Sequence, residues 1–244
     1  MRGEDKANFL SVVDKAIVAA VKAGAWAEIA GQVEELKEAV GGASPSKADM
    51  NWRPPTEISA AAAVLAEKKL AWAVAEGYQF AAFFGDVPTS TGLLGDKGRS
   101  LDLVQVSEQG LGFYDFRVTA SGEDICKGLR QLIVHTVLYR AFLEAPRQFG
   151  YNTERSPLLM ADPAIQWELV APKDMINPRR QELRWGDKDA QEMQKLMRGL
   201  GVSSFSLSRL QAEGEALRAN IAKDNFSPSR ARQWFENRVT VLIA

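Results

Sequence analysis

The stretches Leu101-Asp-Leu-Val-Gln-Val106 and Phe113-Tyr-Asp-Phe-Arg-Val118 decide how this chain folds. Both are rich in β-branched, aromatic and aliphatic residues, and the residues between them include two glycines, so the pattern predicts a β-hairpin. Each strand carries one aspartate, Asp102 in the first and Asp115 in the second. A basic residue, Arg117, follows the second aspartate by two positions. The hairpin therefore combines an apolar framework with charges that need an explanation.

Alternation along the second strand places Asp115 and Arg117 on one face, and Tyr114, Phe116 and Val118 on the other. Buried charges are costly unless they are paired or bound to a metal, so either an ion pair or an exposed face explains these two residues. Asp102 stands in an apolar strand one hairpin away and can converge with Asp115. Two carboxylates and a backbone carbonyl suit Mg²⁺ or Mn²⁺, which can activate water and neutralise charge on phosphate oxygens.

A helix is expected from Ser121 to about Leu143, because a serine cap is followed by an acid three residues later and Pro146 comes after the end. One polar stripe recurs every four residues along this helix and consists of Lys127, Gln131, His135 and Tyr139. The stripe either points inward toward the aspartates or is the solvated face of an amphipathic helix.

We expect the chain to consist of four parts. Residues 1–42 are expected to form an N-terminal helical segment, 43–55 a linker, 56–210 the core, and 211–244 a C-terminal helical extension and tail. The further expected elements are a helix at Ala60–Glu76, strands at Tyr78–Val87, Ile165–Val170 and Val202–Leu207, and helices at Lys188–Leu200 and Leu210–Ala222. Arg238–Ile243 fits a strand or a helix end. This mixed order predicts an α/β (α+β) layered domain with a parallel crossover between its third and fourth strands.

The bulk composition predicts an ordinary globular protein. The chain has 244 residues, of which 46% are hydrophobic and 25% charged, which suffices for one sizeable domain with a helical extension. Its net charge of −1 creates no global basic field, so any contact with nucleic acid needs a local basic patch. The single cysteine, Cys126, excludes an intrachain disulfide. With no signal peptide and no membrane-spanning apolar run, we expect a cytoplasmic protein without membrane contact.

The order of these residues resembles the PD-(D/E)XK nuclease superfamily, which has the restriction-endonuclease-like fold. The pattern of that family is an acid at the start of the second strand, acid-x-Lys on the third, and then a helix bearing glutamine. Asp102 and Asp115 match the two acids, and Gln131 matches the glutamine. Glu67 matches the acid often found on the first core helix of the family, and Arg117 stands where the family has lysine.

The resemblance covers roughly residues 56 to 210, including a closing strand-helix-strand, and implies a metal-dependent nuclease that hydrolyses phosphodiester bonds in DNA, or in RNA. It implies Mg²⁺ or Mn²⁺ bound by Glu67, Asp102 and Asp115. Arg117 or Lys127 would stabilise the charge that develops during the reaction. Gln131 would orient a water molecule or the side chain of Asp115.

Two other interpretations follow from the same residues. Arginine stays protonated and cannot readily act as a base, so the domain could be catalytically inactive and serve as a nucleic-acid- or protein-binding subunit of a larger complex. Alternatively, this is an unrelated α/β domain whose Asp102 and Asp115 point to solvent. The N-terminal helices carry an apolar stripe and no recognisable chemistry, so we expect them to form a homodimer or to dock a protein partner.

Overall fold

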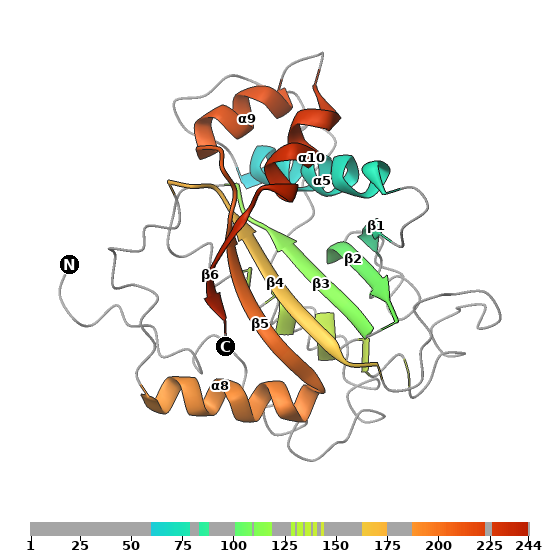
Figure 1. The fold of residues 1–244 in the computed structure, drawn as a ribbon, viewed down its shortest axis with the longest axis vertical. Coiled ribbons are helices and arrows are strands. Elements are labelled where there is room, and N and C mark those ends of the chain that lie inside the picture. Colours follow the sequence, from blue (N-terminus) through green and yellow to red (C-terminus); the bar gives the residue numbers. More distant parts are fainter. Residues whose placement is uncertain are drawn as a thin grey trace.

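One sheet of six strands organises the molecule, in the order β1-β2-β3-β4-β5-β6 (Figure 1). The computed structural model describes residues 60–78, 83–87, 101–108, 110–118, 163–174, 187–222 and 226–243, and between them residues 128–129, 131–133, 135–137, 139–140 and 143. The expected N-terminal helices and linker, and Lys127, lie outside these described residues.

The sheet is mixed, with two antiparallel pairs of strands followed by two parallel pairs and a final antiparallel pair. They are β1 (Phe83–Val87), β2 (Leu101–Ser107), β3 (Gly110–Phe116), β4 (Ile165–Ala171), β5 (Val202–Arg209) and β6 (Val239–Ile243). The first three form an antiparallel meander, β4 and β5 run parallel to β3, and β6 is antiparallel to β5. The predicted hairpin, the parallel crossover and the mixed α/β class are therefore confirmed.

Helices lie at both ends of the sheet. They are α5 (Ala60–Gly77), α8 (Asp187–Leu200), α9 (Gly214–Ala222) and α10 (Pro228–Glu236). In Figure 1, α5, α9 and α10 group together at one end of the sheet, while α8 lies at the other. The described residues between 128 and 143 are also helical, as the sequence predicted for this stretch.

One face of the sheet is buried under α5, α9 and α10. Tyr114, Phe116 and Val118 pack there in a single apolar cluster, as strand alternation predicted. The rings of Phe116 and Phe235 have centroids 5.9 Å apart, so α10 belongs to this core. The helix residues in the cluster are Ala66, Leu70, Ala71, Ala73, Val74, Leu217, Ile221, Ala231 and Phe235.

The other face carries the helical residues between 128 and 143. Trp167 on β4 donates its Nε1–H to Thr136 Oγ1 at 2.8 Å, and Phe113 meets Tyr139 edge-on with ring centroids 5.4 Å apart. His135 and Tyr139 are buried and Gln131 is half-buried. The polar stripe therefore points inward at these three positions, and its interpretation as a solvated helix face is wrong there.

Four local expectations differ from the structure. Helix α9 begins at Gly214 rather than at Leu210. Tyr78 lies in the turn that ends α5 rather than in a strand, and β1 is observed from Phe83. Helix α10 was missed because Pro228–Glu236 is short and only two of its residues, Ala231 and Phe235, are fully buried. The ambiguous segment near the C-terminus is the strand β6, which adjoins β5.

An ion pair ties the C-terminal elements to the sheet. Arg238 donates hydrogen bonds to both carboxylate oxygens of Glu168 on β4: Nε to Oε1, and Nη2 to Oε2 at 3.0 Å. The same guanidinium donates to the carbonyl of Phe235 at 3.0 Å and lies 3.9 Å over that ring. Residues expected to form an extension thus contribute a strand of the sheet and a helix of the core.

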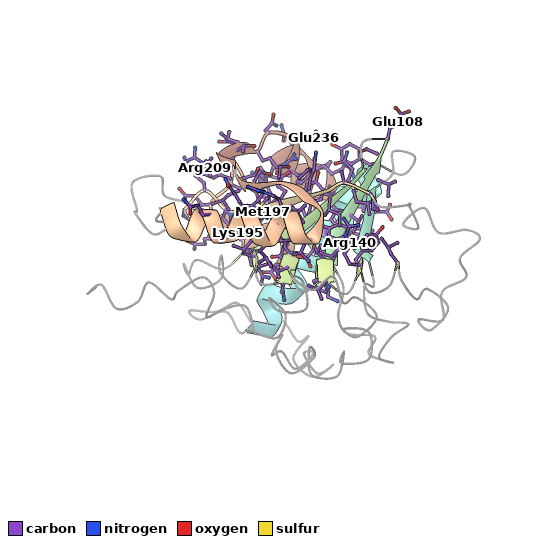
Figure 2. The ribbon with its side chains drawn as sticks, turned by 90° about the horizontal axis from the view of Figure 1, so that it is seen from below. Glu108, Arg140, Lys195, Met197, Arg209 and Glu236 are labelled. Atoms are coloured by element: carbon purple, nitrogen blue, oxygen red, sulfur yellow. The ribbon has the colours of Figure 1, made fainter. Side chains whose placement is uncertain are left out.

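Gly201, between α8 and β5, is a position where only glycine fits. Its φ is +68°, and a Cβ there would come within 1.9 Å of Arg140 Nη2. The buried Arg140 cannot easily retreat, because it donates to the carbonyls of Leu200 at 2.8 Å and Pro163 at 3.2 Å (Figure 2 shows Arg140 beside the end of α8).

We expect Gly201→Ala to lower the free energy of unfolding by at least about 2 kcal/mol, from backbone strain and from the clash with Arg140. Gly199→Ala is the matched control, because Gly199 is an exposed helical residue of α8 and alanine there should be neutral or stabilising. Urea unfolding of both variants measures the difference, and equal stabilities would refute the explanation.

Candidate functional site

Arg117, just beyond β3, is the centre of the predicted site. Its guanidinium faces Asp115 along one edge, with Nη2 donating to Oδ2 at 2.9 Å and Nε 2.6 Å from Oδ1. The second contact lacks the alignment of a hydrogen bond, and Oδ1 and Nε have no other partner. Asp115 is 3% exposed and Arg117 8%. The simplest sequence explanation of these residues, an ion pair, is therefore what the structure contains.

Two further predicted residues meet the same guanidinium. Gln131, from the helix across the face, accepts a short hydrogen bond from Nη2. Glu67, from α5, lies with Oε2 4.0 Å from Nη1, and its Oε1 accepts the backbone N–H of Val118 at 3.3 Å. Glu67 of α5, Arg117 beyond β3 and Gln131 of the helix between 128 and 143 are thus brought together at one point, as the family resemblance implied.

Asp102 joins the cluster from β2. Leu103 pairs with Tyr114 in the antiparallel ladder, and the register continued by one residue sets Asp102 opposite Asp115. Directly opposed residues share a face, so these two carboxyl groups lie on the same side of the sheet. Asp102 Oδ2 accepts the backbone N–H of Phe116 at 2.9 Å, so it also satisfies a donor at the end of β3. The interpretation in which both aspartates face solvent is wrong, because Asp115 is buried.

The helix backbone lies directly on the ion pair at Gly128. A Cβ at this position would lie 2.8 Å from both Arg117 Nε and Asp115 Oδ1, and 2.5 Å from Leu169 Cδ1. Glycine is therefore required for the helix to approach so closely. The consequence is that the pair is covered by protein on the helix side of the sheet.

Burial and mutual repulsion shift the acids of this cluster. Burial raises the pKa of Asp115 to about 8, although Arg117 opposes this and Asp102 adds to it. Burial also raises the pKa of Glu67 well above its ordinary value, again against the effect of Arg117. Arg117 itself is penalised by burial, but Asp115, Glu67 and Asp102 together raise its pKa. The guanidinium thus stays charged, while Asp115 and Glu67 take up protons more readily than they would in water.

The donor set as arranged does not fit a divalent cation. Within the described ranges, no group of three or more His, Cys, Asp or Glu side chains could hold a metal ion. Both oxygens of Asp115 face Arg117, and Asp102 and Glu67 each accept a backbone N–H. The positive charge that these acids receive comes from the guanidinium.

Sequence reasoning missed two residues that shape the site. Gly128 was not singled out, although a glycine inside a helical pattern is a recognised sign of close backbone approach. Leu169, which lies opposite Asp115 on β4 and would meet a side chain at position 128, has no polar signature that could have revealed it. Packing residues of this kind become visible only in three dimensions.

Comparison with protein-family models, with curated proteins and with solved structures finds no match for this chain. None of the described helices is long and apolar enough to cross a membrane.

Proposed function

We propose that this chain is a nuclease-like domain that binds rather than cleaves, and that it works as a nucleic-acid- or protein-binding subunit of a larger complex. The observation that carries the proposal is the buried Asp115–Arg117 pair, sealed by the helix backbone at Gly128. The order of acids, arginine and glutamine supports the restriction-endonuclease-like relationship. Their contacts support a structural rather than a hydrolytic use.

Charge and access distinguish this cluster from a hydrolytic site. A hydrolytic metal site needs carboxylate oxygens that are open to the cation and a route for the phosphate. Here the acid that matches the second family carboxylate is 3% exposed and faces a guanidinium that is charged at every physiological pH. That guanidinium occupies the position in which the family has a lysine beside the cation.

The sheet edge supports a protein partner. β6 is the last strand of the sheet, and Val239 and Val241 on it are 43% and 36% exposed. Five uncharged residues form this strand, Val239–Ile243. An uncharged edge strand with exposed valines is a natural place for another polypeptide to bind.

A cleavage assay tests the proposal. Purified full chain is incubated with supercoiled plasmid, single-stranded DNA and RNA in Mn²⁺ and in Mg²⁺, beside Asp115→Asn and a buffer blank. We expect the wild-type protein to cut no faster than the variant or the blank, because Arg117 already holds Asp115. Metal-dependent cleavage by the wild type that Asp115→Asn lacks would overturn the proposal.

A metal-dependent nuclease is the second candidate. One observation favours it: three acidic side chains surround one guanidinium, and their full ionisation would leave an excess of two negative charges that a divalent cation would neutralise. This candidate requires Arg117 to release Asp115 when the ion arrives. Calorimetric titration of Mn²⁺ into the protein at pH 8 separates the two, because only the nuclease should bind the ion in a manner that Asp115→Asn abolishes.

A further inference from the structure

Arg209, the last residue of β5, carries a buried polar atom that the fold does not satisfy. Its Nε is buried and has no hydrogen-bond partner. The residue as a whole is half-buried. None of the hydrogen bonds or ion pairs found for the described residues involves this side chain. Buried donors are paired in nearly all native structures, so the Nε–H of Arg209 calls for a partner, either water or a ligand.

The register places Arg209 on the same face of the sheet as the acid cluster. Asp115 pairs with Leu169 and Leu169 with Leu207 across three parallel strands. Two residues further along, Ala171 pairs with Arg209, and Arg117 donates its backbone N–H to Val170 beside Ala171. In this row the methyl group of Ala171 is the one side chain between the two arginines. Their Cα atoms are thus two strand spacings, roughly 10 Å, apart.

This row lies at the carboxyl ends of β3, β4 and β5, which run parallel. Open α/β sheets bind their ligands beyond the carboxyl ends of parallel strands. Arg117 is engaged by Asp115 and Gln131, but Arg209 offers an unused guanidinium there. The position of Arg209 is therefore where a ligand of this fold class would be expected.

We infer that Arg209 binds a phosphate group at this edge of the sheet. A guanidinium offers two parallel N–H donors, including Nε–H, to the oxygens of an oxyanion, and phosphate matches that fork. The phosphate could be free or part of a nucleic acid, and the nucleic-acid source rests on the proposed function above. The binding itself requires no cleavage.

Two titrations of the full chain test the inference: inorganic phosphate by calorimetry, and a fluorescein-labelled single-stranded DNA oligonucleotide by anisotropy. We expect the wild-type protein to bind at least one probe, and we expect the Kd of Arg209→Gln for that probe to be larger by about tenfold or more. Arg209→Lys keeps the charge but not the fork, so its Kd should be intermediate. Arg198→Gln, an exposed arginine of α8, is the control and should change Kd less than about twofold.

The outcomes are distinct. Phosphate binding that depends on Arg209 assigns a small-molecule site, and oligonucleotide binding alone assigns a nucleic-acid contact. No binding of either probe, equal binding by Arg209→Gln, or equal binding of acetate and phosphate would overturn the inference. Thermal unfolding of each variant confirms that it is folded, and Arg209→Lys carries the test if Arg209→Gln is not. A negative result in these titrations does not bear on whether the protein cleaves nucleic acid, because the cleavage assay above measures that separately.

Discussion

Replacing Arg117 with methionine is expected to lower the free energy of unfolding by about 3–5 kcal/mol at pH 8, because three acids then lose their buried counter-charge. Methionine keeps most of the apolar stem, so the change isolates the guanidinium. Urea unfolding followed by tryptophan fluorescence measures it, and Trp167 is a buried reporter on the adjacent strand.

Arg198→Met is the matched control for this substitution. Arg198 lies exposed on α8, and its replacement should change stability by less than about 0.5 kcal/mol. A loss below about 1 kcal/mol in Arg117→Met would show that the cluster does not depend on its arginine. The central claim of an internal cation would then be wrong.

The stability of the wild-type protein is expected to fall as the pH rises from about 4 to about 8. Burial raises the pKa of Asp115 from 3.8 to about 8, so the folded state holds a proton that the unfolded state has released across this window. Where the folded state binds more protons, stability decreases with rising pH. The contribution of Asp115 to the free energy of unfolding is fully present near pH 4 and is lost once the pH passes about 8. Glu67, whose pKa is also raised, acts in the same direction.

Glu67→Gln tests the origin of this slope. The amide keeps an oxygen that can accept the Val118 N–H but carries no charge, so it removes one buried carboxylate and its repulsion of Asp115. We expect the variant to be at least as stable as the wild type at pH 8, with a flatter dependence of the urea midpoint on pH. Glu108→Gln, at an exposed position, is the control. A wild-type midpoint that rises between pH 5 and pH 8 would contradict the assignment.

The effects expected for Arg117→Met and for rising pH both follow from a buried guanidinium that is surrounded by acids. In a metal-dependent hydrolase the acids are held ionised and open for a cation that arrives from solvent. In this chain the cation is a side chain, and helix backbone covers it at Gly128. The cluster would then stabilise the junction of α5, β3 and the crossover helix, and binding would take place on other surfaces.

Local pattern was sufficient for much of the fold. The alternation in β2 and β3 predicted both strands, and the helix Ala60–Glu76 was predicted to within one residue of α5. Prediction was poorest where an element is short or evenly apolar. The segment Val239–Ile243 has no period that separates strand from helix, and pairing with β5 resolves it.

The sequence by itself determined which residues of this protein could meet. Strand alternation sets Asp115 and Arg117 on one face, hairpin pairing adds Asp102, and the four-residue spacing of the helix presents Gln131. Tertiary structure alone decided what each of these groups contacts and how it is charged. The pKa of a carboxyl group depends on its burial and on the nearest guanidinium. Asp115 is buried because helix backbone packs against it, and that backbone can approach Asp115 and Arg117 so closely only because residue 128 is glycine.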